Sequence, residues 1–192
     1  MIDSHTNDAY TRGVEYLRVM QGFVLAPAMV DVIENLRDST IICTWIGENI
    51  DVVNQALRCC LEDCHECFYP KMRPAIRIFA VPLAQKFGLD GLCNISTSPI
   101  TILIDAGRVN PKNWLSIVAH EYVHAYLGSP GHGQDFAAVL SHLCLGLGLE
   151  TPPEKMDAFS LRRWPPYPSI VDPLAFWRGE TGICELPRMK LG

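Results

Sequence analysis

Residues 111–136 read PKNWLSIVAHEYVHAYLGSPGHGQDF, which predicts a helix, a tight turn and the start of a second helix. Pro111 suits the first turn of a helix, because an N–H there has no intrahelical partner to lose. The apolar residues that follow at helical spacing are Trp114, Leu115, Val118 and Val123. The run Gly128-Ser129-Pro130-Gly131 is expected to end this helix. A second helix is then predicted from His132 to about Gly146.

The first helix carries an HExxH motif at residues 120–124. Residues four apart share one face of a helix, so His120 and His124 can reach a single metal ion. Glu121 follows the first ligand and in this motif acts as the general base that takes a proton from water. The flanking residues are uncharged and free of proline, as a buried active-site helix requires. The motif therefore predicts one catalytic zinc ion per chain and a metal-dependent hydrolase, with a peptidase as the first hypothesis.

A catalytic zinc site needs a third protein ligand and an open position for water. We predict His132, because the glycine-containing turn before it can fold the chain back over the metal. The other reading of His132 is that it merely begins the next helix. His142 is then the reserve ligand, whereas His5 and His65 have no comparable spacing.

The segment HEYVHAYLGSPGHGQDF resembles the SprT-like zinc metallopeptidases, whose signature is HExxH and, after a variable loop, His-Gly-x-x-aromatic. The second part is here His132-Gly133-Gln134-Asp135-Phe136. The resemblance covers about residues 75–146 and implies an α+β, zincin-like fold of the minimal gluzincin type. It also implies that the three motif histidines bind zinc, that Glu121 is the base, and that an edge strand of the sheet receives an extended peptide.

Other zincin classes make different demands on the sequence. Metzincins need glycine at position 127 and histidine at 130, where this chain has Leu127 and Pro130. Gluzincins take a glutamate ligand from a later helix, for which Glu150 stays an alternative. Relatives of the Spartan type carry basic or zinc-ribbon extensions for DNA, and residues 151–192 hold only Cys184 and a near-balanced charge. Nucleic acid is therefore not the expected partner.

The elements around this segment are predicted from periodicity. Helices are expected at Asn7–Gln21, Pro27–Arg37 and Asn49–Cys67, a strand at Ala75–Val81, and a hairpin of Gly91–Thr97 and Ile100–Ala106 turning at Ser98-Pro99. Beyond Glu150 lie seven of the fourteen prolines, which exclude long helices. We expect one domain at residues 1–150, with N-terminal helices, a small sheet, the HExxH helix and a second helix. A proline-rich extension, residues 151–192, packs on it.

Composition narrows the function further. Apolar residues make up 48% of the 192 residues and charged residues 19%, which is typical of a globular protein. Every apolar run is shorter than the roughly 20 residues that cross a bilayer, so no membrane association is expected. The first residues lack the pattern of a secretory signal, which predicts a cytoplasmic protein. The net charge is −5 with no polybasic run, which favours a protein or peptide substrate over nucleic acid. The oligomeric state stays open.

Four cysteines and a histidine crowd one helical segment. His65 lies in the sequence among four cysteines, Cys59, Cys60, Cys64 and Cys67. A second metal site is conceivable there, but structural zinc usually draws its ligands from two separate elements. We therefore interpret these cysteines as free thiols on an apolar helix face.

Two alternative functions share the same site. The first is a zinc-binding module that recognises peptides without cleaving them, which an intact Glu121 argues against. The second is a site-specific regulatory protease of the ImmA type. Zinc would supply most of the oxyanion stabilisation, and Tyr122, Tyr126 or a tyrosine of the extension is a candidate for an added donor. The proline-rich extension is a candidate lid, with aromatic residues that either cover the cleft or anchor the extension.

Overall fold

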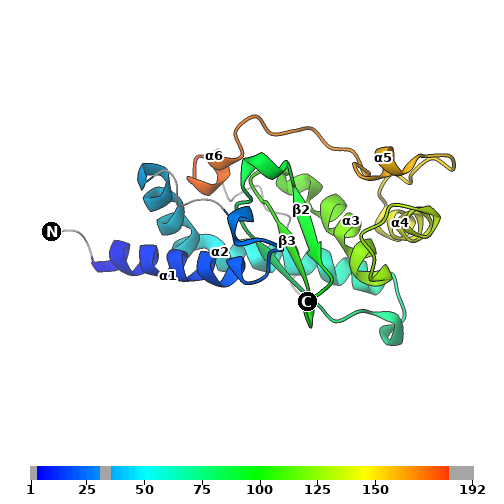
Figure 1. Cartoon of the computed structure of the whole chain (residues 1–192), viewed down its shortest axis with the longest axis horizontal. Helices are drawn as coiled ribbons and strands as arrows, with labels where there is room; N and C mark the ends of the chain where they lie inside the picture. The colour runs from blue at the N-terminus through cyan, green and yellow to red at the C-terminus, as the bar shows by residue number, and fades with distance from the viewer. Residues whose placement is uncertain (1–3, 31–35, 182–192) are drawn as a thin grey trace.

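The computed structural model describes residues 4–30 and 36–181 and has an α+β architecture. The longer helices are α1 (Ser4–Gln21), α2 (Leu36–Glu66), α3 (Trp114–Leu127) and α4 (Gln134–Leu147), and the strands are β1 (Ile76–Ala80), β2 (Gly91–Asn94) and β3 (Ile100–Ile104). Short helices are η1 (Pro27–Met29), η2 (Pro70–Met72), η3 (Gln85–Phe87), η4 (Pro111–Asn113), α5 (Ala158–Leu161) and α6 (Leu174–Trp177). Figure 1 shows α1 and α4 at opposite ends of the molecule, with the sheet between them.

Helices α1 and α2 pack closely because glycine stands at two of their contact points. A Cβ added to Gly13 would overlap the backbone of Cys43, and a Cβ added to Gly47 would overlap the backbone of Ala9. Arg12 also donates from Nε to the carbonyl oxygen of Gly47 at 3.2 Å. Helix α2 contacts α3 and β1 as well, so it links the N-terminal helix to the sheet.

The sheet is small, and its central strand is fully covered. The strand order is β1-β3-β2, with β1 parallel and β2 antiparallel to β3. Three consecutive residues of β3, Ile102, Leu103 and Ile104, have 0% exposure, so both faces of the strand are buried. Strand β2 is an edge strand and contacts α3.

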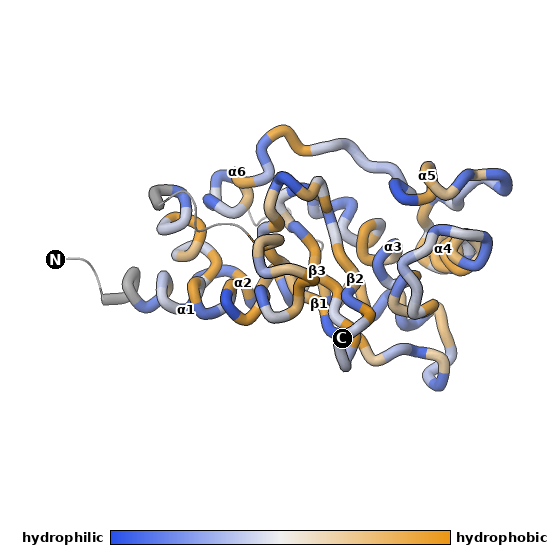
Figure 2. Tube along the Cα trace, in the orientation of Figure 1, coloured by the Kyte–Doolittle hydropathy of each residue, from blue (hydrophilic) through white to orange (hydrophobic). Residues whose placement is uncertain are grey.

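Helix α3 is buried along almost its whole length. It contacts α2, α4, β2 and β3, and every residue from Ser116 to Ala125 is buried. Burial on several sides explains why the helix has no charged face. Figure 2 shows hydrophobic residues gathered along the strands beside it. Among the described residues, no helix is both long and apolar enough to span a membrane.

Two of the helices predicted before the sheet are wrong in extent. Within the described part of the predicted helix Pro27–Arg37, Pro27–Met29 forms a single turn, Val30 is extended, and Leu36 and Arg37 already belong to α2; residues 31–35 lie outside the described residues. The helix predicted from Asn49 begins at Leu36. Its buried positions Ile42, Ile46 and Ile50 continue the predicted apolar stripe toward the N-terminus. Gly47, a residue type that weakens helices, stands where α1 packs closely on this helix.

The strands, the hairpin and the two later helices form as predicted, with shorter bounds. One detail differs, because His132 does not open α4. The helix begins at Gln134 after the extended residue Gly133, and His132 lies in the preceding loop. A helical backbone therefore does not set the direction of the His132 ring.

The proline-rich extension contains only the four-residue helices α5 and α6 within its described part, in agreement with the exclusion of long helices. Figure 1 shows the segment between them running along one side of the molecule from α5 to α6. Leu161 and Trp177 are 1% and 0% exposed, so the segment is attached to the core near both ends.

Candidate metal centre

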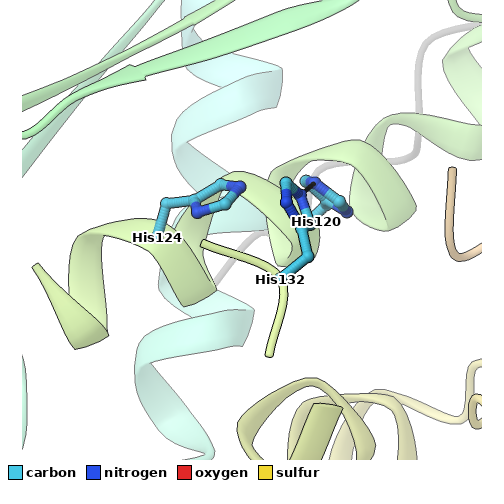
Figure 3. A group of neighbouring side chains, drawn as sticks. All are labelled: His120, His124 and His132. Carbon is cyan, nitrogen blue, oxygen red and sulfur yellow. Dashed lines mark hydrogen bonds between the residues drawn. The ribbon is translucent and has the colours of Figure 1, made fainter. Parts of the chain in front are cut away.

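Three histidines from two segments converge on one point. His120 and His124 lie one turn apart on α3 and are only 6% and 8% exposed. His132 reaches them from the loop before α4, and Figure 3 shows the three rings gathered around a common space. One ligand nitrogen from each lies within 4.8 Å of the other two, which is close enough to bind a metal ion. It is the only such group of histidine, cysteine or carboxylate side chains in the described part of the chain.

Backbone carbonyls set the tautomer of the two helical histidines. His120 Nδ1 lies 2.8 Å from the carbonyl oxygen of Trp164, and His124 Nδ1 lies 2.9 Å from that of Ser129. A carbonyl oxygen only accepts, so each Nδ1 carries the proton. In a neutral imidazole the other nitrogen, Nε2, then presents a free lone pair. Such a hydrogen bond behind a ligand histidine is typical of metal sites.

The surroundings keep these rings neutral. Burial, with a smaller contribution from His124 and His132, lowers the pKa of His120 from 6.5 to about 3 against the opposing effect of the Trp164 carbonyl. Burial also lowers the pKa of His124. Burial, His124 and Arg162 together lower the pKa of His132 to about 4. Metals bind deprotonated histidine, so the cluster is held in the form that binds a cation.

The spacing of the nitrogens fits a zinc ion. His120 Nε2 and His132 Nε2 are 3.2 Å apart. Two nitrogens bound tetrahedrally at about 2.0–2.1 Å from zinc lie roughly 3.3–3.4 Å apart. Three neutral imidazoles are also a donor set that zinc prefers. The residues present therefore fit the ion that the sequence predicts.

Phe136 is the packing partner shared by all three histidines. Its ring centroid lies 5.0 Å from His120, 4.8 Å from His124 and 4.5 Å from His132. Phe136 is 1% exposed. It belongs to the hydrophobic core. The contacts add that it holds the orientation of the three rings.

Glu121 projects from α3 toward the edge strand and is 6% exposed. Its Oε1 lies 2.9 Å from where a Cβ of Gly91 would stand. Burial raises its pKa from 4.5 to about 8, the backbone N–H of Cys93 opposes this increase, and Asp90 adds to it. A divalent cation in the histidine cluster would favour the charged form of the carboxylate.

The extension reaches the same region from the other side. The carbonyl of Trp164 holds His120, and the hydroxyl of Tyr167 donates to Asp90 Oδ2 at 3.1 Å. Farther along, Trp177 Nε1 donates to Asp105 Oδ1 at 2.8 Å. Residues 164–177 thus attach to the first ligand, to the residue before β2 and to the residue after β3.

The other candidate ligands lie elsewhere. His65 Nδ1 is 3.0 Å from the Tyr122 hydroxyl, and His142 Nε2 donates to the carbonyl oxygen of Cys67 at 2.8 Å. The carbonyl of Glu150 accepts from Trp164 Nε1, and its carboxylate belongs to no metal-binding group. The cysteines of α2 also form no such group within the described residues; Cys60 and Cys64 are buried free thiols.

Two of the tyrosines considered as oxyanion donors face away from the histidines. The Tyr122 hydroxyl is hydrogen-bonded to His65 Nδ1, and the Tyr122 ring stacks on Phe68 with the ring centroids 5.6 Å apart. Tyr126 stacks on Phe68 at 4.5 Å and lines a cavity of about 680 Å³ that none of the three histidines borders. Tyr167 of the extension is the third tyrosine candidate: burial raises its pKa, and the nearby charges of Asp90 and Glu121 add to this increase.

Sequence reasoning missed the two carbonyls behind His120 and His124, and the shared contact of Phe136 with all three rings. A backbone carbonyl leaves no trace in residue type. No protein family model, curated protein or solved structure matches this chain.

Proposed function

We propose that this protein is a zinc-dependent peptidase with a zincin-like fold, similar to the SprT-like enzymes. The observation that carries the proposal is the convergence of His120, His124 and His132, whose possible ligand atoms all lie within 4.8 Å of one another. Glu121, the residue after His120 on the same helix, supplies a buried carboxylate. A site that only stores metal has no need of that carboxylate.

When bound, zinc supplies a Lewis acid that lowers the pKa of water toward neutrality and polarises a carbonyl oxygen. The three histidines hold the ion, and their hydrogen bonds to Trp164 and Ser129 keep the rings oriented. Glu121 takes the proton from the attacking water and later delivers it to the leaving amine. Its buried position keeps the carboxylate out of bulk water, which strengthens these proton transfers.

The substrate we propose is an extended peptide. Strand β2 is the edge of the sheet nearest α3, and an edge strand offers backbone groups that an extended chain can pair with. The absence of a polybasic run in the sequence gives no support to a nucleic-acid substrate.

The test is zinc content after extensive dialysis, for the wild type and for His120→Ala, His132→Ala and Glu121→Gln, each checked for folding. We expect one zinc per chain in the wild type and in Glu121→Gln, and loss of zinc in both histidine variants. His142→Ala is the matched control and should retain the metal. Tight zinc binding by His132→Ala would exclude His132 as a ligand.

Activity is measured on an unfolded protein such as reduced casein. The zinc-loaded wild type should cleave it, and Glu121→Gln with the same zinc content should not. Cleavage of a single partner protein alone would indicate a regulatory protease. Zinc binding without any cleavage would leave a peptide-binding module and overturn the proposed activity.

A further inference from the structure

Gly91, the first residue of β2, touches the proposed base. A Cβ added there would lie 2.9 Å from Glu121 Oε1, 3.1 Å from Cγ and 3.2 Å from Cδ. A Cβ atom in a real protein essentially never has such a neighbouring atom within 3.0 Å. The carboxylate of Glu121 therefore occupies the volume that any other residue at position 91 would fill.

The strand presents Gly91 to α3 because of its register. Gly91 pairs with Ile104 and Cys93 with Ile102. The amide of Asp105 donates to the carbonyl oxygen of Asp90, so Asp90 pairs through its backbone with the central strand. Backbone groups of an antiparallel strand alternate in direction, which turns those of Gly91 and Cys93 toward the outer edge, where Glu121 lies.

The position of this strand end is fixed from the extension and from the loop after β3. Tyr167 donates its hydroxyl to Asp90 Oδ2 at 3.1 Å. Arg108 Nη1 lies 3.8 Å from Asp90 Oδ1, and Arg108 Nε lies 3.4 Å from Asp105 Oδ2. Asp90, immediately before Gly91, thus has a hydrogen bond at one carboxylate oxygen and an ion pair at the other.

We propose that Gly91 is a positioning residue for Glu121: its missing side chain lets the carboxylate lie against β2, and Tyr167 and Arg108 hold the strand there through Asp90. This inference rests on the proposed function, because it assigns a role in placing the catalytic base. The contact itself is a property of the folded chain and is testable without any activity.

The direction of the effect follows from the stiffness of the two partners. Strand β2 is hydrogen-bonded to β3 and held at Asp90, whereas the Glu121 side chain rotates about several bonds. A methyl group at position 91 therefore displaces the carboxylate more readily than the strand. Misplacement of a catalytic group by about 1 Å can reduce the rate by roughly 100-fold.

The contact is tested by a double-mutant cycle in thermal unfolding, which separates a pairwise contact from independent effects. Gly91→Ala should lower the Tm in the wild-type background. In the Glu121→Ala background the added methyl group has room, so the same substitution should leave the Tm unchanged or raise it. Equal shifts in both backgrounds would show that Gly91 and Glu121 do not interact and would overturn the inference.

The role in positioning is tested by kinetics on zinc-loaded enzyme. Gly91→Ala should keep one zinc and a near wild-type KM while kcat falls about 10- to 100-fold, as expected for a displaced base. In the Glu121→Asp background, where the shorter side chain leaves room, Gly91→Ala should reduce kcat much less. Leu92→Val changes the next residue of the same strand without adding an atom, and serves as the control for general disturbance of β2.

The outcomes distinguish the two proposals. A wild type that binds zinc but cleaves nothing would overturn the proposed peptidase activity, and the unfolding cycle would still decide whether Gly91 holds Glu121. If the wild type is active and Gly91→Ala loses no more activity than Leu92→Val, then Gly91 is not a positioning residue.

Discussion

A metal site made of histidine depends on which ring nitrogen carries the proton. In this protein that choice is made for His120 and His124 by two carbonyl oxygens, which accept from Nδ1 and leave Nε2 free. Burial lowers the pKa of both rings, so proton competition for the metal is weak. Phe136 adds the third constraint by packing against every ring of the cluster.

Phe136→Ala is the residue-scale prediction. Phe136 is 1% exposed, and removal of a buried phenylalanine ring costs about 3–5 kcal/mol of unfolding free energy. Zinc affinity should also fall, because the three rings lose their common contact. Both are measured, by denaturant unfolding and by competition with a chelator.

Leu140→Ala is the matched control for this change. Leu140 lies one turn later on α4 and is 0% exposed, so it should lose a similar stability, about 2–5 kcal/mol. Leu140→Ala leaves the ring contacts of Phe136 with the histidines in place, so the zinc affinity of the folded variant should stay close to that of the wild type. Equal losses of zinc affinity in both variants would remove Phe136 from the site.

At the scale of elements, the site requires a loop, a helix and an edge strand to meet. Helix α3 supplies His120, Glu121 and His124, the loop before α4 supplies His132, and β2 supplies the surface against which Glu121 lies. The described part of the extension contributes a carbonyl and a tyrosine hydroxyl. A substitution that shifts one of these elements should therefore also alter the placement of site residues on the others.

Tyr167→Phe tests the link between the extension and β2. The substitution removes one hydrogen bond to Asp90, for which a loss of about 0.5–1.5 kcal/mol in unfolding free energy is expected. If the Tyr167–Asp90 hydrogen bond holds β2 in place, kcat should decrease while the zinc content stays at one per chain. Tyr10→Phe is the control, because Tyr10 lies on α1 and its hydroxyl has no hydrogen bond among the described residues. A wild-type kcat for Tyr167→Phe would show that catalysis does not need the Tyr167–Asp90 hydrogen bond.

Gly13→Ala tests the contact between α1 and α2. An added methyl group would overlap the backbone of Cys43, and neither helix can rotate a backbone atom away. Alanine favours the helix by about 1 kcal/mol over glycine, so a strong decrease in Tm would show that the close contact outweighs helix propensity. Gly131→Ala, where the nearest atom is Ser129 Oγ at 3.5 Å, should leave the Tm near the wild-type value.

At the scale of the whole molecule, Asp105 joins the extension to the sheet. It is 2% exposed, and its carboxylate accepts from the backbone N–H groups of Leu83 and Gly107 and from Trp177 Nε1. Arg108 is the cation nearest to it. Burial nevertheless raises the pKa of Asp105 from 3.8 to about 6. The extension is thus fastened to the core at a buried acid, which favours an anchored segment over a freely opening lid.

This raised pKa predicts a pH dependence of stability. Between about pH 4 and pH 6 the folded protein binds more protons at Asp105 than the unfolded chain, so the contribution of this group to stability falls as pH rises. Asp105→Asn cannot titrate. The difference in unfolding free energy, wild type minus variant, should therefore be larger near about pH 4.5 than at about pH 7. A difference that is constant or increases with pH would contradict the raised pKa.

Local patterns in the sequence were sufficient for much of the fold and for the candidate ligands. The period of the apolar residues and the positions of proline and glycine predict α3, α4, the hairpin and the absence of long helices after Glu150. The HExxH spacing places His120 and His124 on one face, because the geometry of a helix is the same in every context. Errors occurred where tertiary contacts override local preference, as at Gly47, which a neighbouring helix holds inside α2.

Only the tertiary structure decided how His132, Glu121 and the extension are placed. His132 lies in a loop, and its Nε2 meets Nε2 of His120, twelve residues earlier in the chain, at 3.2 Å. The carbonyls of Trp164 and Ser129 carry no sequence signal, since every residue has one. The contact of Gly91 with Glu121 joins positions thirty residues apart in the chain. Its cause is strand register, which depends on pairing across the sheet and not on residue type alone.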